Sequence, residues 1–233
     1  PVAFGGDLGG VELGEAAPVV IGVPELGLDD LLGLNVTGRV TGTRNWLWWF
    51  HAIAAKIARD RQKGNAVFYD GFEKDGDLDF VDMEGDGKIT GDMAILRVIL
   101  EMLVASGKLA TISVDPSCVD DIKATCAEFG FTEEAGNFIG ERQGVGLMKA
   151  IKTSERRLAA GTLKHCGQPL MTWCVGNAKV RLTSSAMLIE REASGKGKID
   201  PLVAGFDAVM SMSADPTPVS TTSIYETRGL RVA

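Results

Sequence analysis

The chain has 233 residues, which fits one substantial domain or two small ones and is enough to bury a hydrophobic core. Hydrophobic residues make up 45% and charged residues 24%, values that exclude a disordered, collagen-like or membrane-embedded chain. Lys and Arg number 24 against 31 Asp and Glu, and the formal net charge of -7 argues at first against a nucleic-acid partner.

Compartment and completeness follow from a few further features. No stretch reaches the roughly 18 uninterrupted apolar residues of a membrane span, so we expect a soluble protein without a membrane partner. The four cysteines form no Cys-x-x-Cys pair and there are only two histidines, which argues against a zinc site or a disulfide framework. A reducing, intracellular compartment is the simplest interpretation. Because the chain begins with Pro1, we expect an excised or processed fragment.

The first part of the chain predicts strands, then a helix and a loop. Residues 2–4 indicate a strand that enters a glycine-rich turn, and residues 18–23 indicate a second strand. Residues 34–40 are a weaker candidate for a third strand, because glycines interrupt the surrounding pattern. The aromatic-rich segment 46–61 is predicted as a helix, and the acidic segment 70–92 as a surface loop.

The second part alternates helices and strands, which indicates an α/β or mixed α+β domain without internal repeats. The helix predicted at 145–160 carries Lys149, Lys152, Arg156 and Arg157 away from its apolar face. The complete set of predictions after residue 92 comprises a helix at 92–105, a buried strand at 109–114, a helix at 117–129, a weak strand at 138–139, the helix at 145–160, a hairpin of 178–182 with 186–191, and a helix at 198–211.

Familiar nucleotide and metal motifs are absent or imperfect. No Gly-x-x-x-x-Gly-Lys-Ser/Thr sequence and no Gly-x-Gly-x-x-Gly sequence occurs, so neither a P-loop nor a dinucleotide fold is supported. Residues 82–93 imitate a calcium-binding EF-hand loop, but Met93 stands where a bidentate Glu is required. A solvated acidic loop is the better interpretation.

Three aspartates stand where strand and helix ends could bring them together. Asp7 follows the first predicted strand, Asp115 ends the buried strand, and Asp200 opens the last helix. Sites in α/β sheets gather at the carboxyl ends of strands, and converging carboxylates require divalent cations such as Mg²⁺ or Mn²⁺. Each residue also has a structural interpretation, since Asp7 suits a turn and both Asp115 and Asp200 precede a proline as helix caps do.

Four motifs in the second half resemble, in order and content, the carboxyl-terminal nuclease region of tailed-bacteriophage terminase large subunits. They are Arg142-Gln143-Gly144, residues 158–166 (Leu-Ala-Ala-Gly-Thr-Leu-Lys-His-Cys), residues 168–177 (Gln-Pro-Leu-Met-Thr-Trp-Cys-Val-Gly-Asn) and residues 197–204 (Gly-Lys-Ile-Asp-Pro-Leu-Val-Ala). More weakly, the strand ending at Asp115 and the segment Gly5-Gly6-Asp7-Leu8 resemble the family's other two acidic strand ends. Residues 10–44 match the family poorly, and Gly9 replaces its usual Ser or Thr.

The resemblance implies an RNase H-like fold, with a central mixed sheet flanked by helices and an additional β-hairpin before the last helix. It implies a nuclease domain over residues 1–213, a flexible tail over 214–233, and an ATPase domain that this chain lacks. Asp7, Asp115 and Asp200 would be the catalytic residues and the ligands of two Mg²⁺ or Mn²⁺ ions. Asp207 is either an additional metal-side acid or, more simply, a surface residue.

The implied activity is metal-dependent endonucleolytic cutting of concatemeric double-stranded viral DNA in the host cytoplasm, by two-metal phosphodiester hydrolysis. The implied partners are double-stranded DNA, the ATPase domain, the small subunit and the portal. Two alternatives remain open: another RNase H-like nuclease such as a resolvase, and a non-catalytic docking module of the packaging motor.

The negative net charge of the whole chain conceals a segment that is strongly basic. Residues 141–198 hold eleven bases and four acids, whereas residues 70–92 hold nine acids and two bases. The basic segment contains the predicted hairpin, so its cations are candidates for sequence-independent contacts with DNA phosphates. These candidates are Lys179, Arg181, Arg191, Lys196 and Lys198.

Overall fold

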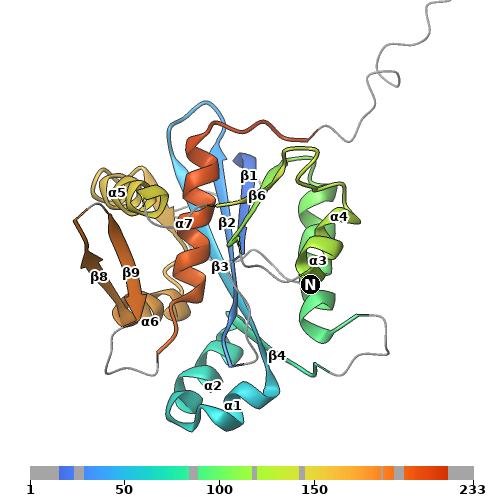
Figure 1. Cartoon of the computed structure of the whole chain (residues 1–233), viewed down its shortest axis with the longest axis vertical. Coiled ribbons are helices and arrows are strands. Elements are labelled where there is room, and N and C mark those ends of the chain that lie inside the picture. The colour runs from blue at the N-terminus through green and yellow to red at the C-terminus, as the bar shows by residue number, and fades with distance from the viewer. Residues whose placement is uncertain are drawn as a thin grey trace, which may run out of the picture.

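The computed structural model describes residues 16–23, 29–83, 89–116, 120–141, 145–184, 186–191 and 197–219, which build one mixed sheet with helices on both faces (Figure 1). In chain order the elements are β1 (Ala16–Val23), β2 (Leu32–Val40), β3 (Trp46–Ala55), α1 (Lys56–Arg61), a short 3-10 turn (Lys63–Asn65), α2 (Ala66–Asp75), β4 (Leu78–Val81), α3 (Gly91–Ala105), β5 (Leu109–Val114), α4 (Asp120–Ala127), β6 (Phe138–Gly140), α5 (Val145–Ala159), β7 (Leu163–His165), α6 (Pro169–Asn177), β8 (Ala178–Leu182), β9 (Met187–Arg191) and α7 (Asp200–Ser213).

The central sheet has the order β4-β3-β2-β1-β5-β6, with β7 also paired to β3. Strands β1, β2 and β3 form an antiparallel meander, whereas β5 pairs parallel with β1 and β6 pairs parallel with β5. Strands β8 and β9 form a separate antiparallel hairpin. The expected mixed sheet, with its additional hairpin before the last helix, is therefore confirmed.

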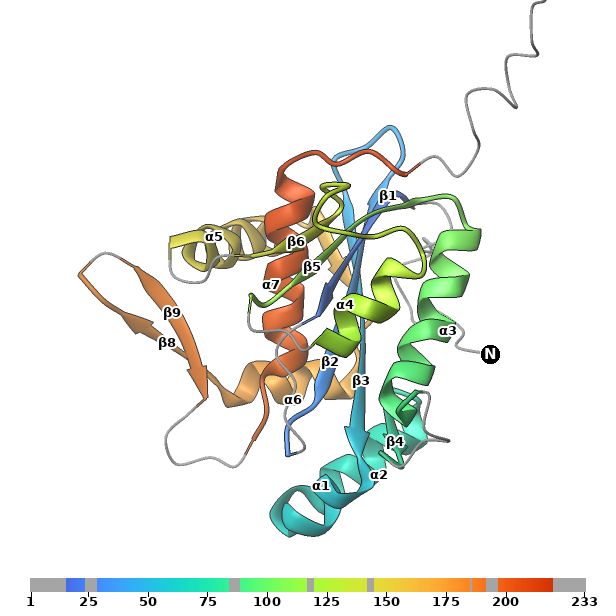
Figure 2. The same cartoon turned by 45° about the vertical axis from the view of Figure 1, so that its right-hand side comes forward.

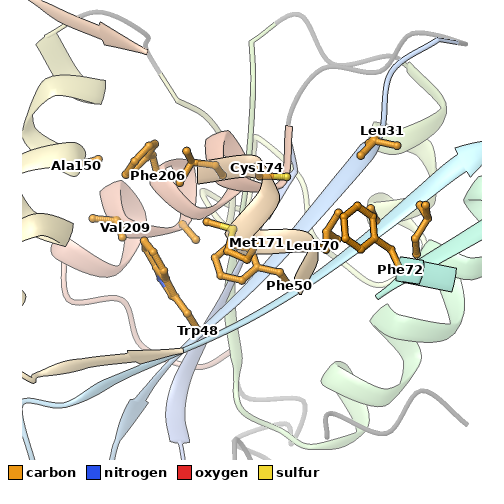
Figure 3. Close-up of a cluster of buried hydrophobic side chains, with 14 of the residues drawn as sticks. Leu31, Trp48, Phe50, Phe72, Ala150, Leu170, Met171, Cys174, Phe206 and Val209 are labelled. Carbon is orange, nitrogen blue, oxygen red and sulfur yellow. The ribbon is translucent and has the colours of Figure 1, made fainter. Parts of the chain in front are cut away.

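Helices cover the two faces of the sheet with two separate hydrophobic clusters. Helices α3 and α4 lie on one face, and α5, α6 and α7 lie on the other (Figures 1 and 2). Successive side chains of β3 point alternately into the two clusters. Leu47 and Trp49 belong to the first cluster, and Trp48 and Phe50 belong to the second. Figure 3 shows the second cluster, where Trp48 and Phe50 meet side chains of α5, α6 and α7.

Segment 46–61 was expected to be helical, and that expectation is wrong for its first ten residues. Trp46–Ala55 is strand β3, and only Lys56–Arg61 forms a helix. All ten residues of β3 are buried, because both of its faces are covered by helices. A strand buried on both faces has no alternation of polar and apolar residues, so its hydrophobic run resembles that of a buried helix.

The acidic segment 70–92 is not mainly a loop. It contains the end of α2, strand β4 and the start of α3, and residues 84–88 within it lie outside the described part of the chain. Tyr69 and Phe72 of α2 are buried while the acids between and after them face solvent, so the helix is amphipathic beneath its acidic composition.

Other predicted elements agree with the structure. Strand β5 has the predicted bounds, and β2, α3, α5, the hairpin and α7 occur within two or three residues of their predicted positions. The strand predicted at 2–4 lies outside the described residues. None of the described helices has both the length and the apolar character that crossing a bilayer requires.

Candidate active site

The carboxyl ends of β1 and β5 lie side by side and place Asp115 at one end of the sheet. Val23 pairs with Val114, so Asp115 is the first residue beyond the pairing. The amide of Glu141, just after β6, donates a 2.8 Å hydrogen bond to the carbonyl oxygen of Val114. Asp115 is half-buried and directly follows the buried strand, which is the position that the sequence predicted.

Helix α7 brings Asp200 to the same end of the sheet by packing against two glycines. A Cβ atom at Gly33 of β2 would lie 2.5 Å from the backbone nitrogen of Pro201, and one at Gly22 of β1 would lie 1.8 Å from the carbonyl oxygen of Ala204. Only residues without a side chain allow this approach. Gly22 of β1 pairs with Asn35 of the antiparallel β2 and with Ser113 of the parallel β5. Gly33 stands two residues before Asn35 and Asp115 two residues after Ser113, so both lie at the same level of the sheet.

The two acids are therefore at one end of the sheet but at different strand positions across it. Asp200 lies over β2, Asp115 follows β5, and β1 runs between them. Two strand spacings amount to roughly 10 Å, because neighbouring strands lie about 4.8 Å apart. The residue that follows β1 in the sequence is Pro24, which has no side-chain oxygen to offer and which lies outside the described residues.

The carboxyl group of Asp200 is held in an environment that disfavours its charge. Burial, and secondarily the neighbouring carboxylate of Asp30, raise the pKa of Asp200 from 3.8 to about 6, against the opposing influence of Lys198 and Arg191. Its Oδ2 atom is buried and has no hydrogen-bond partner among the described residues. Asp200 is the first residue of α7, after Ile199 at the N-cap, so it is not the capping residue that the alternative interpretation required.

A buried lysine accompanies Asp200, and the sequence did not predict this. The Nζ atom of Lys198 lies 2.6 Å from Oδ1 of Asp30, and the Lys198 side chain is only 5% exposed. Arg191 of β9 lies 3.9 Å from the same oxygen. The one available signal was Asp29-Asp30, an acid pair a few residues before the strand predicted at 34–40, in the segment that matched the family poorly.

The wall of this site comes from α2 and α6. Burial raises the pKa of Tyr69 to about 12, with Asp200 and Asp30 adding to the effect. The pKa of the Cys174 thiol is raised well above its usual value, first by burial and then by Asp200. Neither group is thus ionised at neutral pH, and both contribute an apolar surround to the Asp200 carboxyl (Figure 3 shows Cys174).

Asp7 lies outside the described residues, so its part in the site stays a prediction. The strand that runs beside β5 is β1, which begins nine residues after Asp7. Asp7 therefore precedes β1 in the sequence and does not follow it. Glu25 is the first acid after β1 in the sequence.

Asp207 is fully buried in α7, so the interpretation of this residue as a surface aspartate is wrong. It lies one helical turn before Ser211, whose hydroxyl group contacts both Ser113 of β5 and the Glu141 carboxylate. Burial raises the pKa of Glu141, and the Ser211 hydrogen bond partly opposes that effect. The Ser113, Ser211 and Glu141 side chains thus form a polar cluster between α7 and the sheet.

The predicted DNA-contacting residues fall into three groups. Lys179, Arg181 and Arg191 are exposed on the hairpin, where Arg181 forms a 2.6 Å ion pair with Glu190. Lys196 lies outside the described residues. Lys198 is buried against Asp30, so its ammonium group is not the exposed phosphate contact that we expected.

The donor set suits a hard divalent cation only in part. Asp115 and Asp200 supply carboxylate oxygens of the type that Mg²⁺ and Mn²⁺ prefer, and the buried Oδ2 of Asp200 is a ready ligand atom. Within the described ranges, no group of three or more His, Cys, Asp or Glu side chains is arranged to hold a metal. A third ligand would come from the parts that are not described, which include Asp7 and Glu25.

The sheet order, the antiparallel meander, the parallel β5 and β6 and the final helix across the sheet together make the expected RNase H-like fold, which two solved large-terminase structures share. The large terminase of bacteriophage HK97 matches with a TM-score of 0.66 and 19% identity, over 85% of this chain and 41% of that chain. The large terminase nuclease of the thermophilic phage G20c matches with a TM-score of 0.50 and 12% identity, over 83% and 84% of the two chains.

Similarity in sequence is more limited. Protein YmfN of Escherichia coli strain K12 is 32% identical over 82 residues, which are 35% of this chain and 18% of YmfN. No family model matches the chain. The chain thus spans less than half of the HK97 terminase and less than a fifth of YmfN, and its likeness to the solved structures establishes the fold of a large-terminase nuclease domain.

Proposed function

We propose that this chain is the endonuclease domain of a viral DNA-packaging large terminase, which cuts concatemeric double-stranded DNA in the host cytoplasm. The observation that carries the proposal is the placement of Asp115 and Asp200 at one end of the sheet in a terminase-nuclease fold, with a buried and unpartnered Oδ2 on Asp200 among the described residues. A carboxylate is kept there at the cost of desolvation, as expected of a site that binds a cation.

Asp115 and Asp200 would hold Mg²⁺ or Mn²⁺, together with a third acid from the residues that are not described. Such ions, when bound as a pair, activate a water molecule and stabilise charge on the leaving oxygen. The chain's own residues hold the acids in place: Gly22 and Gly33 fix the approach of α7, and Lys198 limits the repulsion between Asp30 and Asp200. The exposed hairpin cations would contact phosphates.

Cleavage of supercoiled plasmid in Mn²⁺ or Mg²⁺ tests the proposal. Asp115→Asn and Asp200→Asn should each reduce nicking and linearisation to the level seen in excess EDTA, while melting as cooperatively as wild type. Asp121→Asn is the matched control, because Asp121 is an exposed acid on α4. Retained cleavage in a folded Asp115→Asn protein would refute the proposal. Asp7→Asn and Glu25→Gln, compared in the same assay, would identify the third acid.

A non-catalytic docking module is the second candidate, favoured by two observations. Pro24 follows the strand beside Asp115, and Asp30 near Asp200 is already paired with Lys198 and Arg191. In that case the wild-type protein would not cleave plasmid, but would bind the ATPase domain, small subunit or portal, and Asp115→Asn would leave that binding unchanged. Preference for branched over linear duplex would instead indicate a resolvase-like nuclease.

A further inference from the structure

We propose that the exposed face of α5 is a second contact surface for the phosphate backbone of duplex DNA, beside the hairpin. This face is formed by Lys149, Lys152 and Arg156, here called the α5 basic stripe. The three residues recur at spacings of three and four, so they share one side of the helix. The buried Leu147, Ala150 and Ser154 occupy the opposite side.

The cations of the α5 basic stripe are not neutralised within the described structure. None of the three forms an ion pair with a described acid, although Glu155 lies between them in the sequence. Several cations elsewhere on the surface are paired, in contrast: Arg59 contacts both Asp70 and Glu73, and Lys56 contacts Asp82. The stripe thus keeps its charge available for an external anion.

Arg157, near the end of α5, belongs to a group of neighbouring arginines with Arg39 and Arg44. The Arg157 guanidinium lies 3.6 Å from the ring centre of Trp46 and donates a 2.9 Å hydrogen bond to the carbonyl oxygen of Arg44. Burial, followed by the like charges of Arg39 and Arg44, lowers the pKa of Arg157. Asp215 pairs with Arg39, whereas Arg44 and Arg157 form no ion pair with an acid among the described residues. A bound phosphate would relieve this repulsion.

The α5 basic stripe lies on a helix that neighbours the hairpin. Helix α5 packs against α7 and lies next to β9, and both views show α5 and the hairpin on the same side of the sheet (Figures 1 and 2). Arg156 lies seven positions after Lys149, a rise of roughly 10 Å along the helix. That length matches about three phosphates of one strand, at 3.4 Å of helix axis each.

Duplex DNA fits this surface better than single-stranded nucleic acid. Single-strand sites combine cations with exposed aromatic rings on which bases stack. The α5 basic stripe has no aromatic residue, and the nearby Trp46 is buried beneath Arg157. The identity of the anion as DNA rests on the proposed function, whereas the presence of an unneutralised cationic surface does not.

The test is duplex DNA binding by Lys149→Gln/Lys152→Gln, measured by fluorescence anisotropy in EDTA from 50 to 200 mM salt. The matched control is Lys63→Gln/Lys74→Gln, which removes the same charge from two exposed lysines near α2 that are unpaired in the described structure. The stripe variant should bind several-fold more weakly. Its plot of log affinity against log salt should be less steep by about 2, one unit for each lost phosphate contact.

Wild-type affinity and salt slope in the stripe variant, or an equal loss in the control, would overturn the inference. A loss confined to RNA duplex of the same length would also overturn it. Because binding is measured in EDTA, the result does not depend on catalysis. If the wild-type protein cleaves no DNA but the stripe variant selectively loses binding, the proposed nuclease activity is refuted and the proposed DNA-contact surface is supported. Thermal melting of both variants confirms that they are folded.

Discussion

The side-chain amide of Gln168 pairs with both backbone polar groups of Phe50. Its Oε1 accepts a 2.8 Å hydrogen bond from the Phe50 amide, and its Nε2 donates a 2.7 Å bond to the Phe50 carbonyl oxygen. This contact fills the edge of β3 between the stretch paired with β7 and the stretch paired with β4. Gln168 thus replaces the hydrogen bonds of a neighbouring strand where β3 is paired with neither β7 nor β4.

Gln168→Leu should therefore destabilise the protein strongly. It would leave the buried Phe50 groups without these bonds, and Asp77 would lose its 2.7 Å bond from Nε2. Each buried polar group left unpaired costs about 1–3 kcal/mol. Urea unfolding should show a lower midpoint with an unchanged slope. Glu134→Leu, at an exposed turn position, is the control and should leave the midpoint nearly unchanged.

Two glycine substitutions should have opposite effects. Gly22→Ala should reduce the free energy of unfolding by about 1–3 kcal/mol or more, because its Cβ would overlap the Ala204 carbonyl and force α7 off the sheet. Gly71→Ala in α2 should stabilise by about 0.5–1 kcal/mol, because nothing lies within 4 Å of the added carbon and alanine favours the helix. Thermal melts of both variants would show this, and equal melting temperatures would contradict it.

Lys198 and Asp30 should behave as a coupled pair in a double-mutant cycle. Lys198→Met leaves Asp30 and Asp200 without their buried cation, and removing one partner of a buried pair costs up to about 3–5 kcal/mol. The value should fall below that range because Asp30 is 39% exposed. Adding Asp30→Asn should restore part of the loss, measured by urea unfolding. Additive losses would indicate that the pair does not stabilise the fold.

The contact between His51 and Asp79 should make stability depend on pH in the acid range. The 3.0 Å hydrogen bond from His51 lowers the pKa of Asp79 from its usual 3.8, so the folded state favours the carboxylate. The resulting stabilisation is present above about pH 4 and is lost as the pH falls further. In Asp79→Asn, unfolding free energy should fall less steeply below pH 4 than in wild type. Asp121→Asn should retain the wild-type slope.

The sequence predicted two kinds of element: a short apolar run with a turn residue at each end, even where it is wholly buried, and a helix with one face in water. Strand β5 was bounded correctly by Gly107 before it and Asp115 after it, and α5 showed its period through the contrast between Leu147 and Lys149. Strand β3 failed because both of its faces are buried, which removes that contrast. Helix α2 failed because its acids outnumber the two aromatic residues that anchor it.

The acids of the candidate site were predicted only where they stand at the start or the end of a recognisable element. Asp115 and Asp200 qualify, since one ends a strand and the other begins a helix. Asp30 was missed because its importance comes from Lys198, 168 residues away in the chain. Long-range pairing of this kind leaves no local pattern. Asp207 was assigned to the surface on the average behaviour of aspartate, which buried polar groups under a helix do not follow.

Helix α7 is both the last helix that the structure describes and the element that covers β1, β2 and β5. Its first residue is Asp200, so one segment completes the core and supplies an acid of the candidate site. During synthesis, the apolar face of the sheet that α7 covers remains exposed until this helix has been made. A chain interrupted before residue 200 would therefore lack both a finished fold and the Asp200 end of the candidate site, so neither could exist before the other.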